Sequence, residues 1–218
     1  MSTYTGNVTP GGPADVREMT GLIVSKLSVG PMDNNAYLLR CPATGEQVLI
    51  DAANEAPRLL ELVGDGGLSA VVTTHRHQDH WMALQEVIAA TGARSLVHTA
   101  DAEGLPLPSE LLTDGDRIRV GARELEVIHL VGHTPGSVAL LYQDDVDGVH
   151  LFTGDSLFPG GVGNTDRDPA RFTSLITDVE RKLFDRLPDE TWFYPGHGRD
   201  STLGAERPAL PQWRARGW

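Results

Sequence analysis

Apolar residues recur along this chain in short runs with the two-residue period of β-strands, and turn-forming residues separate the runs. Three such runs, 22–27, 36–40 and 47–51, follow one another with Pro, Asn, Thr and Gly between them, which predicts a meander. The run that begins at Ala70 is apolar on both faces at its start, as expected of a strand in the middle of a sheet. Further runs occupy 95–98, 117–120, 125–130, 138–142, 149–153 and 191–194.

Three segments show the three-to-four-residue spacing of amphipathic helices. They are 54–64, with Asn54 as the cap, 79–92, and 168–187, where Asp168 precedes a proline at the first helical position. Strands in two groups, with helices between and after them, predict an α/β (α+β) fold. In that fold two sheets pack face to face and the helices lie outside.

Length and composition fit one domain. A chain of 218 residues with 40% hydrophobic residues can bury a substantial core. Residues 1–20 contain Gly and Pro without periodicity, so we expect an extended or poorly ordered lead-in before a single domain over 21–218. The N-terminus lacks signal-peptide features, no run approaches the roughly 18 apolar residues of a membrane span, and Cys41 is the only cysteine. We therefore expect a cytoplasmic protein without a disulfide or membrane contact.

The net charge argues against nucleic acid as a substrate. The chain has 18 Lys and Arg against 30 Asp and Glu, and the formal charge of −12 would repel a phosphate backbone. Basic residues are in local excess only near the C-terminus, at 199, 207, 214 and 216. We expect these residues to contact water rather than an anionic partner.

The most informative segment is His75-Arg-His77-Gln-Asp79-His80, directly after the buried strand. His75 and His77 are two residues apart in extended chain, so their imidazoles point to the same side and can bind one ion. Asp79 and His80 lie at the start of the next predicted helix, where the backbone turns back toward the same point. Gathering four ionisable side chains within six residues would be costly unless cations compensated the crowding. The segment therefore predicts a site that faces two ions.

Three later segments repeat one architecture, in which an apolar strand leads to a glycine-containing turn and then to a candidate ligand. They are Leu130-Val-Gly-His133-Thr-Pro-Gly-Ser137, Leu151-Phe-Thr-Gly-Asp155-Ser and Tyr194-Pro-Gly-His197-Gly. Five of the eight histidines fall in the motifs, which favours a shared metal site over scattered polar residues in loops. His98, His129 and His150 fit no motif, and we expect them to be ordinary strand or surface histidines.

The four motifs together resemble those of the metallo-β-lactamase-fold hydrolases, and among them the glyoxalase II-like (hydroxyacylglutathione hydrolase-like) branch, over about residues 21–207. The resemblance implies an αββα sandwich of two mixed β-sheets, with the site at one edge between the sheets. It implies two sets of metal ligands that share one carboxylate. The first set is His75, His77 and His133, the second is Asp79, His80 and His197, and Asp155 bridges both.

Two weaker matches agree with the resemblance. Asn34-Asn-Ala-Tyr-Leu-Leu39 is similar to an early segment of the family. Asp51 ends the 47–51 strand, where the family has an Asp that supports the ligand loop. We expect Asp51 to accept a hydrogen bond from that loop or from a ligand histidine.

The implied cofactors are two divalent metal ions. Zinc is the expected metal, with iron or manganese as alternatives, because histidine and carboxylate ligands do not separate zinc from iron. Two ions about 3.5–4 Å apart can lower the pKa of a shared water to near neutrality and so supply a metal-bridging hydroxide. A leaving thiolate needs little protonation, so a small-molecule acyl thioester suits a site whose catalytic candidates, besides the metals, are Asp79 and Asp155.

Two departures from the family pattern bear on the substrate. Glyoxalase II has an additional helical region after its last ligand, which supplies glutathione contacts, whereas 21 residues follow His197 here. Shorter members without that region also exist. Related sequences often have Arg where this chain has Asn164, so a cation that could bind a substrate carboxylate is missing.

Other branches of the family set the alternatives. Antibiotic-degrading members commonly have Cys or His at the position of Asp155, and nucleic-acid-processing members carry an inserted domain. The alternatives left open are a persulfide dioxygenase, a hydrolase of another ester or lactone class, and a non-catalytic module. The dioxygenase would hold a single iron on His75, His77 and either His133 or Asp155. An intact ligand set argues against the non-catalytic module, and the sequence leaves the oligomeric state open.

Overall fold

The computed structural model describes residues 4–217. Its first sheet has seven strands in the order β1-β2-β3-β4-β5-β6-β7, antiparallel from β1 to β4 and parallel from β4 to β7. Strands β2, β3 and β4 of the antiparallel part are the meander that the sequence predicts. The strands are β1 (Asp15–Glu18), β2 (Ile23–Val29), β3 (Asn34–Arg40), β4 (Gln47–Ile50), β5 (Ala70–Thr73), β6 (Arg94–His98) and β7 (Glu110–Leu112).

The second sheet has six strands in the order β15-β14-β11-β10-β9-β8, with β11 and β14 parallel and the other neighbours antiparallel. Both sheets are therefore mixed. The strands are β8 (Arg117–Val120), β9 (Arg123–His129), β10 (Val138–Asp144), β11 (Gly148–Gly154), β14 (Trp192–Pro195) and β15 (Ser201–Thr202), and a short hairpin of β12 (Leu157–Phe158) and β13 (Gly161–Val162) follows β11.

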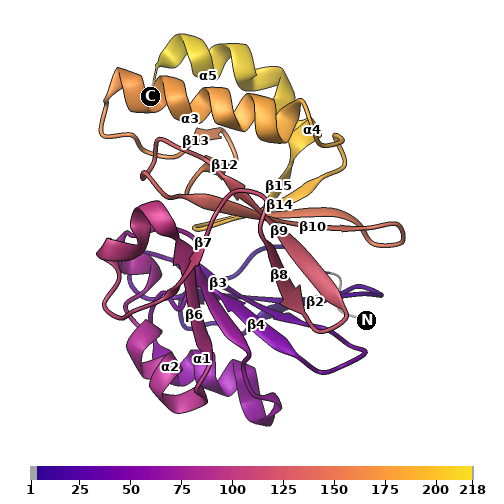
Figure 1. The fold of residues 1–218 in the computed structure, drawn as a ribbon. Coiled ribbons are helices and arrows are strands. Elements are labelled where there is room, and N and C mark those ends of the chain that lie inside the picture. Colours follow the sequence, from indigo (N-terminus) through magenta and orange to yellow (C-terminus); the bar gives the residue numbers. More distant parts are fainter. Residues whose placement is uncertain (1–3, 218) are drawn as a thin grey trace.

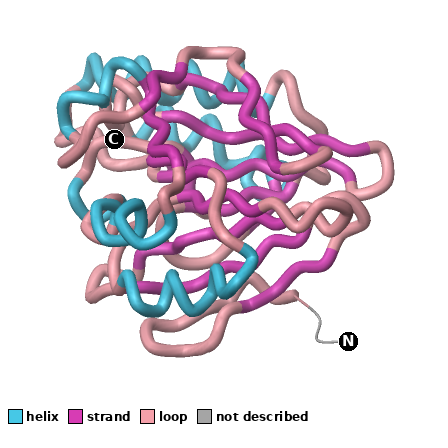
Figure 2. Tube along the Cα trace, turned by 60° about the horizontal axis from the view of Figure 1, so that its bottom comes forward, coloured by secondary structure: helices cyan, strands magenta, loops and turns pink. Residues whose placement is uncertain are grey.

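The two sheets form the inner layers of a sandwich, and helices cover the two outer faces (Figure 1; Figure 2). The predicted αββα architecture is confirmed. No helix within residues 4–217 is long and apolar enough to cross a membrane. Helices α1 (Ala56–Val63) and α2 (Leu84–Thr91) lie on the first sheet, and α3 (Pro169–Asp178), α4 (Leu203–Glu206) and α5 (Leu210–Arg216) lie on the second.

Apolar side chains from both sheets fill the space between them. Val24, Ile50 and Val72 of the first sheet share one buried cluster with Leu140 and Phe152 of the second, and none of the five is more than 1% exposed. Burying a side chain of this size contributes about 1.5–3 kcal/mol. The packed sandwich therefore fixes the strand ends and the loops that follow them.

The N-terminal part of the fold differs from the prediction in two places. Residues 15–18, within the segment expected to be an extended or poorly ordered lead-in, form β1 and pair with β2. Asn54 does not cap α1, because its side-chain oxygen accepts the N–H of the next residue, Glu55, at 2.8 Å. Glu55 takes the cap position instead, with a φ of 51°.

The other two predicted helices are present, but the first begins later than predicted and the second changes from α-helix to π-helix near its end. The helix expected from Asp79 begins at Leu84, because residues 78–80 form a 3-10 turn in which the N–H of His80 bonds to the carbonyl of His77. The helix capped by Asp168 is formed as predicted, with the carboxylate accepting two backbone N–H groups. It continues after α3 as a π-helical turn, Val179–Phe184.

Candidate metal centre

Four loops meet at one edge of the sandwich, at the ends of strands from both sheets. Backbone hydrogen bonds join them: the N–H of Val138 donates to the carbonyl of Thr74 at 3.0 Å, and the N–H of Gly196 donates to the carbonyl of Gly154 at 2.8 Å. These bonds join the four segments in two pairs, although the members of each pair are far apart in the sequence. They comprise residues 74–80 after β5, 130–137 between β9 and β10, 155 after β11, and 196–197 after β14.

His75, His77 and His133 form a first group of donors. Nε2 of His75 lies 3.1 Å from Nδ1 of His77 and 3.2 Å from Nε2 of His133. The donor atoms of the three side chains lie within 4.8 Å of one another, so a single ion can contact all of them. The imidazoles of His75 and His77 do point to the same side, as the extended spacing predicts.

Asp79, His80 and His197 form a second group beside the first. Oδ2 of Asp79 lies 3.5 Å from Nε2 of His80 and 3.4 Å from Nε2 of His197. The donor atoms of this group also lie within 4.8 Å of one another. The 3-10 turn over 78–80 directs the two consecutive side chains toward this point.

The carboxylate of Asp155 lies between the two groups. Its Oδ1 is 3.4 Å from Nε2 of His80, and its Oδ2 is 3.5 Å from Nε2 of His197 and 3.6 Å from Nε2 of His133. Asp155 thus approaches donors of both groups. The structure brings together all seven side chains that the sequence singled out.

Hydrogen bonds on the outer side of three rings set which nitrogen carries the proton. Nδ1 of His133 lies 2.7 Å from the carbonyl of Asn164, and Nδ1 of His197 lies 2.9 Å from the carbonyl of Met32. Nδ1 of His80 lies 2.8 Å from a carboxylate oxygen of Asp51. Because these oxygens only accept, each Nδ1 donates, and Nε2 of the neutral ring keeps its lone pair facing the centre.

His75 is oriented in the same way through a hydroxyl group. The hydroxyl of Thr74 donates to Asp51 at 2.8 Å, so it accepts from Nδ1 of His75, 3.1 Å away. The lone pairs on Nε2 of His75 and His133 therefore face each other across 3.2 Å. Two acceptors in this position repel unless a cation lies between them.

The unsatisfied polar atoms of the centre support the same interpretation. Nε2 of His80 and Oδ1 of Asp155 are buried and have no hydrogen-bond partner within the part of the chain that the structure describes. A buried polar atom left unpaired costs about 1–3 kcal/mol. Metal ions would satisfy both atoms and the facing lone pairs, so the donor set fits the implied cations.

Burial sets the charge state of the first group. It lowers the pKa of His75 well below its ordinary value, and it lowers the pKa of His77 and His133 as well. Neutral imidazole is the form that binds metal. The first group is therefore in its metal-binding form at neutral pH.

The second group favours positive charge. Burial opposes protonation of His80, but the carboxylates of Asp155 and Asp51 outweigh it and raise the pKa of that ring well above its ordinary value. Burial also opposes protonation of His197, whose pKa Asp155 and Asp79 raise to about 10. The carboxylates thus hold a positive charge here, whether protons or metal ions supply it.

Two side chains support the candidate ligands. Asp51, predicted for this role, accepts the backbone N–H of Thr74 at 2.7 Å in addition to its bonds to the Thr74 hydroxyl and His80. Asn34, whose role the sequence did not indicate, donates to Oδ2 of Asp79 at 2.8 Å and lies 3.4 Å from Nε2 of His197. The sequence feature that pointed to Asn34 is the similarity of its segment to an early segment of the family.

The centre is open to solvent at both groups, because His77 of the first group is exposed and two side chains of the second group are partly exposed. The side chains of Asp79 and His197 are 20% and 23% exposed, whereas His80 is fully buried. Met32, 60% exposed, and Phe158, whose ring lies 6.4 Å from that of His197, flank the opening. Apolar side chains therefore border the open side of the second group.

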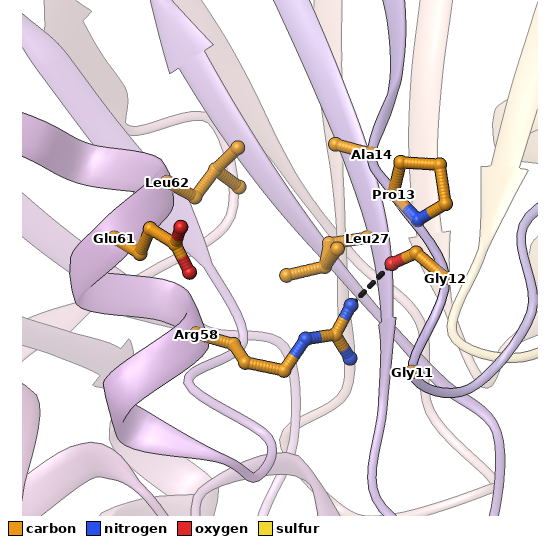
Figure 3. A pocket seen from close by; sticks show the side chains of 8 residues that line it. All are labelled: Gly11, Gly12, Pro13, Ala14, Leu27, Arg58, Glu61 and Leu62. Carbon is orange, nitrogen blue, oxygen red and sulfur yellow. Dashed lines mark hydrogen bonds between the residues drawn. The ribbon is translucent and has the colours of Figure 1, made fainter.

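The three histidines outside the motifs lie elsewhere, as predicted. The rings of His98 and His129 stack at 3.8 Å, and His150 bonds to the hydroxyl of Tyr194. A separate hollow of about 450 Å³ lies between α1 and residues 11–14, and Arg58 reaches across it to the carbonyl of Gly12 (Figure 3). None of the seven clustered side chains lines this hollow.

The family model of the metallo-beta-lactamase superfamily matches residues 29–197, a range that contains the whole cluster. The chain belongs to this superfamily. A relative named hydroxyacylglutathione hydrolase, from Fuscovulum blasticum, is 38% identical over 167 residues, which are 76% of this chain and 62% of the relative. This superfamily member thus spans less than two thirds of that relative's length.

Solved structures of other proteins agree with the superfamily assignment. ETHE1 from Myxococcus xanthus has a TM-score of 0.77 and 30% identity, over 88% of this chain and 84% of that one. TTHA1623, determined in a di-iron-bound form, has a TM-score of 0.70 and 34% identity, over 84% of this chain and 96% of that one. The predicted fold and family resemblance are confirmed.

Proposed function

We propose that this chain is a metal-dependent hydrolase that acts on a small-molecule acyl thioester. The observation that carries the proposal is the geometry of the seven donors, in two groups that share the carboxylate of Asp155. Family membership supports hydrolysis, and the relative named hydroxyacylglutathione hydrolase supports a thioester. Because the chain spans 62% of that relative, the proposal does not extend to glutathione as the thiol carrier.

The proposed roles follow the two groups. His75, His77 and His133 would hold one divalent ion, Asp79, His80 and His197 would hold the other, and Asp155 lies where it could contribute to both. Two ions held together supply a hydroxide at neutral pH and polarise a carbonyl group. We take zinc as the metal, with iron or manganese as alternatives; the di-iron form of TTHA1623 shows that iron binds in a relative.

The protein's own residues limit the leaving groups that suit the site. The hydrogen bond with His197 and that from Asn34 keep the pKa of Asp79 low against the effect of burial, so this carboxylate is ionised at neutral pH. Because Asp79 is ionised, it can accept and orient a proton but holds none to donate to a leaving group. A thiolate, which leaves without full protonation, fits this limit better than an alkoxide or an amine.

The test combines metal analysis with two assays on the same zinc-loaded protein. We expect about two metal ions per chain, release of free thiol from S-acyl thiols, and no oxygen consumption at an oxygen electrode. Fewer than one metal per chain, or no thiol release from a panel of acyl thioesters, contradicts the proposal. The dioxygenase alternative uses one iron and leaves the second group without a role; oxygen uptake with a persulfide and iron would support it instead.

A further inference from the structure

A buried carboxylate that no sequence motif indicated lies between two of the loops that carry the first group. Asp101 is 1% exposed and belongs to a 3-10 turn, Thr99–Gly104, that follows β6. Its Oδ2 accepts the backbone N–H of Arg76 at 3.0 Å and the hydroxyl of Thr134 at 2.5 Å. Its Oδ1 accepts the backbone N–H of Gly136 at 2.9 Å.

The bonded partners are the neighbours of the first-group histidines. Arg76 lies between His75 and His77 in the chain, and Thr134 follows His133. One carboxylate therefore joins the loop after β5 to the loop between β9 and β10. Hydrogen bonds to an ionised carboxylate are roughly twice as strong as those between neutral groups, so this contact restrains both loops.

The same contact explains the second glycine of the His133 motif, Gly136. A Cβ atom at Gly136 would lie 2.7 Å from the backbone nitrogen of Asp101 and 2.7 Å from its Cγ, closer than real Cβ contacts. Only glycine lets the backbone approach the carboxylate in this way. Thr134 and Gly136 of the motif are thus the two residues through which Asp101 contacts this loop.

We propose that Asp101 is a positioning residue for the first metal. The lone pairs on Nε2 of His75 and His133 face each other at 3.2 Å, and their repulsion would push the two loops apart before a cation binds. Asp101 opposes this separation from outside the donor set and so keeps the three imidazoles arranged for binding. The inference rests on the metal-binding part of the proposed function and needs no assumption about the substrate.

The test compares Asp101→Asn with a matched control, Asp147→Asn. Asp147 also accepts two backbone N–H groups and one hydroxyl, from Thr20, Gly21 and Tyr142, but at the hairpin between β10 and β11. Zn²⁺ affinity is measured by competition with a chelator, and hydrogen exchange of residues 74–77 and 131–137 is measured on the metal-free chain. Both variants should lose thermal stability; only Asp101→Asn should weaken the first Zn²⁺ site, by about tenfold or more, and speed exchange in both loops.

Equal Zn²⁺ affinity in Asp101→Asn, Asp147→Asn and the parent overturns the inference, whatever the loss of stability. Thr134→Val, which removes one of the three bonds, decides the matter if Asp101→Asn does not fold: weaker Zn²⁺ binding supports the inference and unchanged binding overturns it. A parent chain that binds no Zn²⁺ overturns the proposed function together with this inference. The two failures are therefore distinguishable.

Discussion

At the scale of residues, the centre depends on groups that are not themselves ligands. Backbone carbonyls of Asn164 and Met32 orient His133 and His197, and any residue type at those positions supplies such a carbonyl. The Asn at position 164, where relatives often have Arg, therefore leaves the orientation of His133 unaffected. Orientation of His80 instead depends on one particular side chain, the carboxylate of Asp51.

We expect Asp51→Asn to weaken Zn²⁺ binding at the second group by about 10- to 100-fold. Asp51 has a φ of 59°, a conformation that Asn also tolerates, so the backbone is retained. The amide nitrogen cannot accept, so at least one of the bonds from Thr74 and His80 is lost. Asp116→Asn is the control, because Asp116 also accepts the N–H and hydroxyl of a threonine, Thr113, but far from the centre and on a single oxygen. Equal Zn²⁺ titration curves for the two variants would rule out this role.

Replacing Asp155 with Ala should reduce thiol release to the uncatalysed background and abolish occupancy of the second metal site. The reason is that this carboxylate is the donor that approaches both groups. The fold should be largely kept, because the sandwich core does not include Asp155. Circular dichroism and metal analysis check the two parts separately. Turnover equal to that of the parent would show that the bridge is another residue.

At the scale of elements, the sequence predicts where ligands lie better than how each loop turns. A metal ligand that follows a buried strand can be predicted from the sequence, because strand ends meet at one edge of a sheet. The 3-10 turn before α2 could not be predicted, because the helical spacing of the apolar residues over 79–92 indicated a helix start at Asp79. The pairing of β11 with β14 shifts between Phe152 and Gly154, just before Asp155, and this irregularity also left no signal in the hydrophobic pattern.

An ion pair joins β9 to the segment that follows the π-helical turn Val179–Phe184. Arg186 donates to both carboxylate oxygens of Glu126, at 2.7 and 2.8 Å. The hydrogen bonds from Arg186 lower the pKa of Glu126. Stability from a lowered carboxyl pKa is fully present above the unfolded-state value of about 4.3, and it is lost as the pH falls through the folded-state value.

We therefore expect Glu126→Gln to lower the free energy of unfolding by at most about 1 kcal/mol at pH 7 and by much less at pH 3. Urea unfolding at the two pH values measures the difference. Glu124→Gln is the control, because Glu124 is exposed and lies 3.9 Å from Arg117. A loss of stability that is the same at both pH values would show that the ion pair is not its source.

At the scale of the whole molecule, the ligand set and the two-sheet architecture could be predicted, whereas the connections between loops could not. The motifs place seven candidate residues by local spacing and family resemblance. Asp101 lies in no motif, and the family segment that contains Asn34 does not indicate its role, because their partners lie 25 to 35 residues away for Asp101 and 45 residues away for the Asn34 bond to Asp79. Strand order and register likewise depend on packing between distant segments, and no local pattern encodes them.

The centre should also contribute to global stability, because its ligands come from both sheets of the sandwich. A metal at 1,000 times its dissociation constant stabilises a folded chain by about 4 kcal/mol, and for a chain of this size each kcal/mol shifts the melting temperature by about 2–4 °C. We expect a chelator to lower the melting temperature by about 10 °C, with a folded metal-free chain remaining because the apolar core lies outside the centre. Calorimetry with and without chelator measures the shift. Added Zn²⁺ should reverse it and Mg²⁺ should not, since histidine nitrogens favour Zn²⁺. An unchanged melting temperature after verified metal removal would mean that the two sheets hold the donors together without help from the ions.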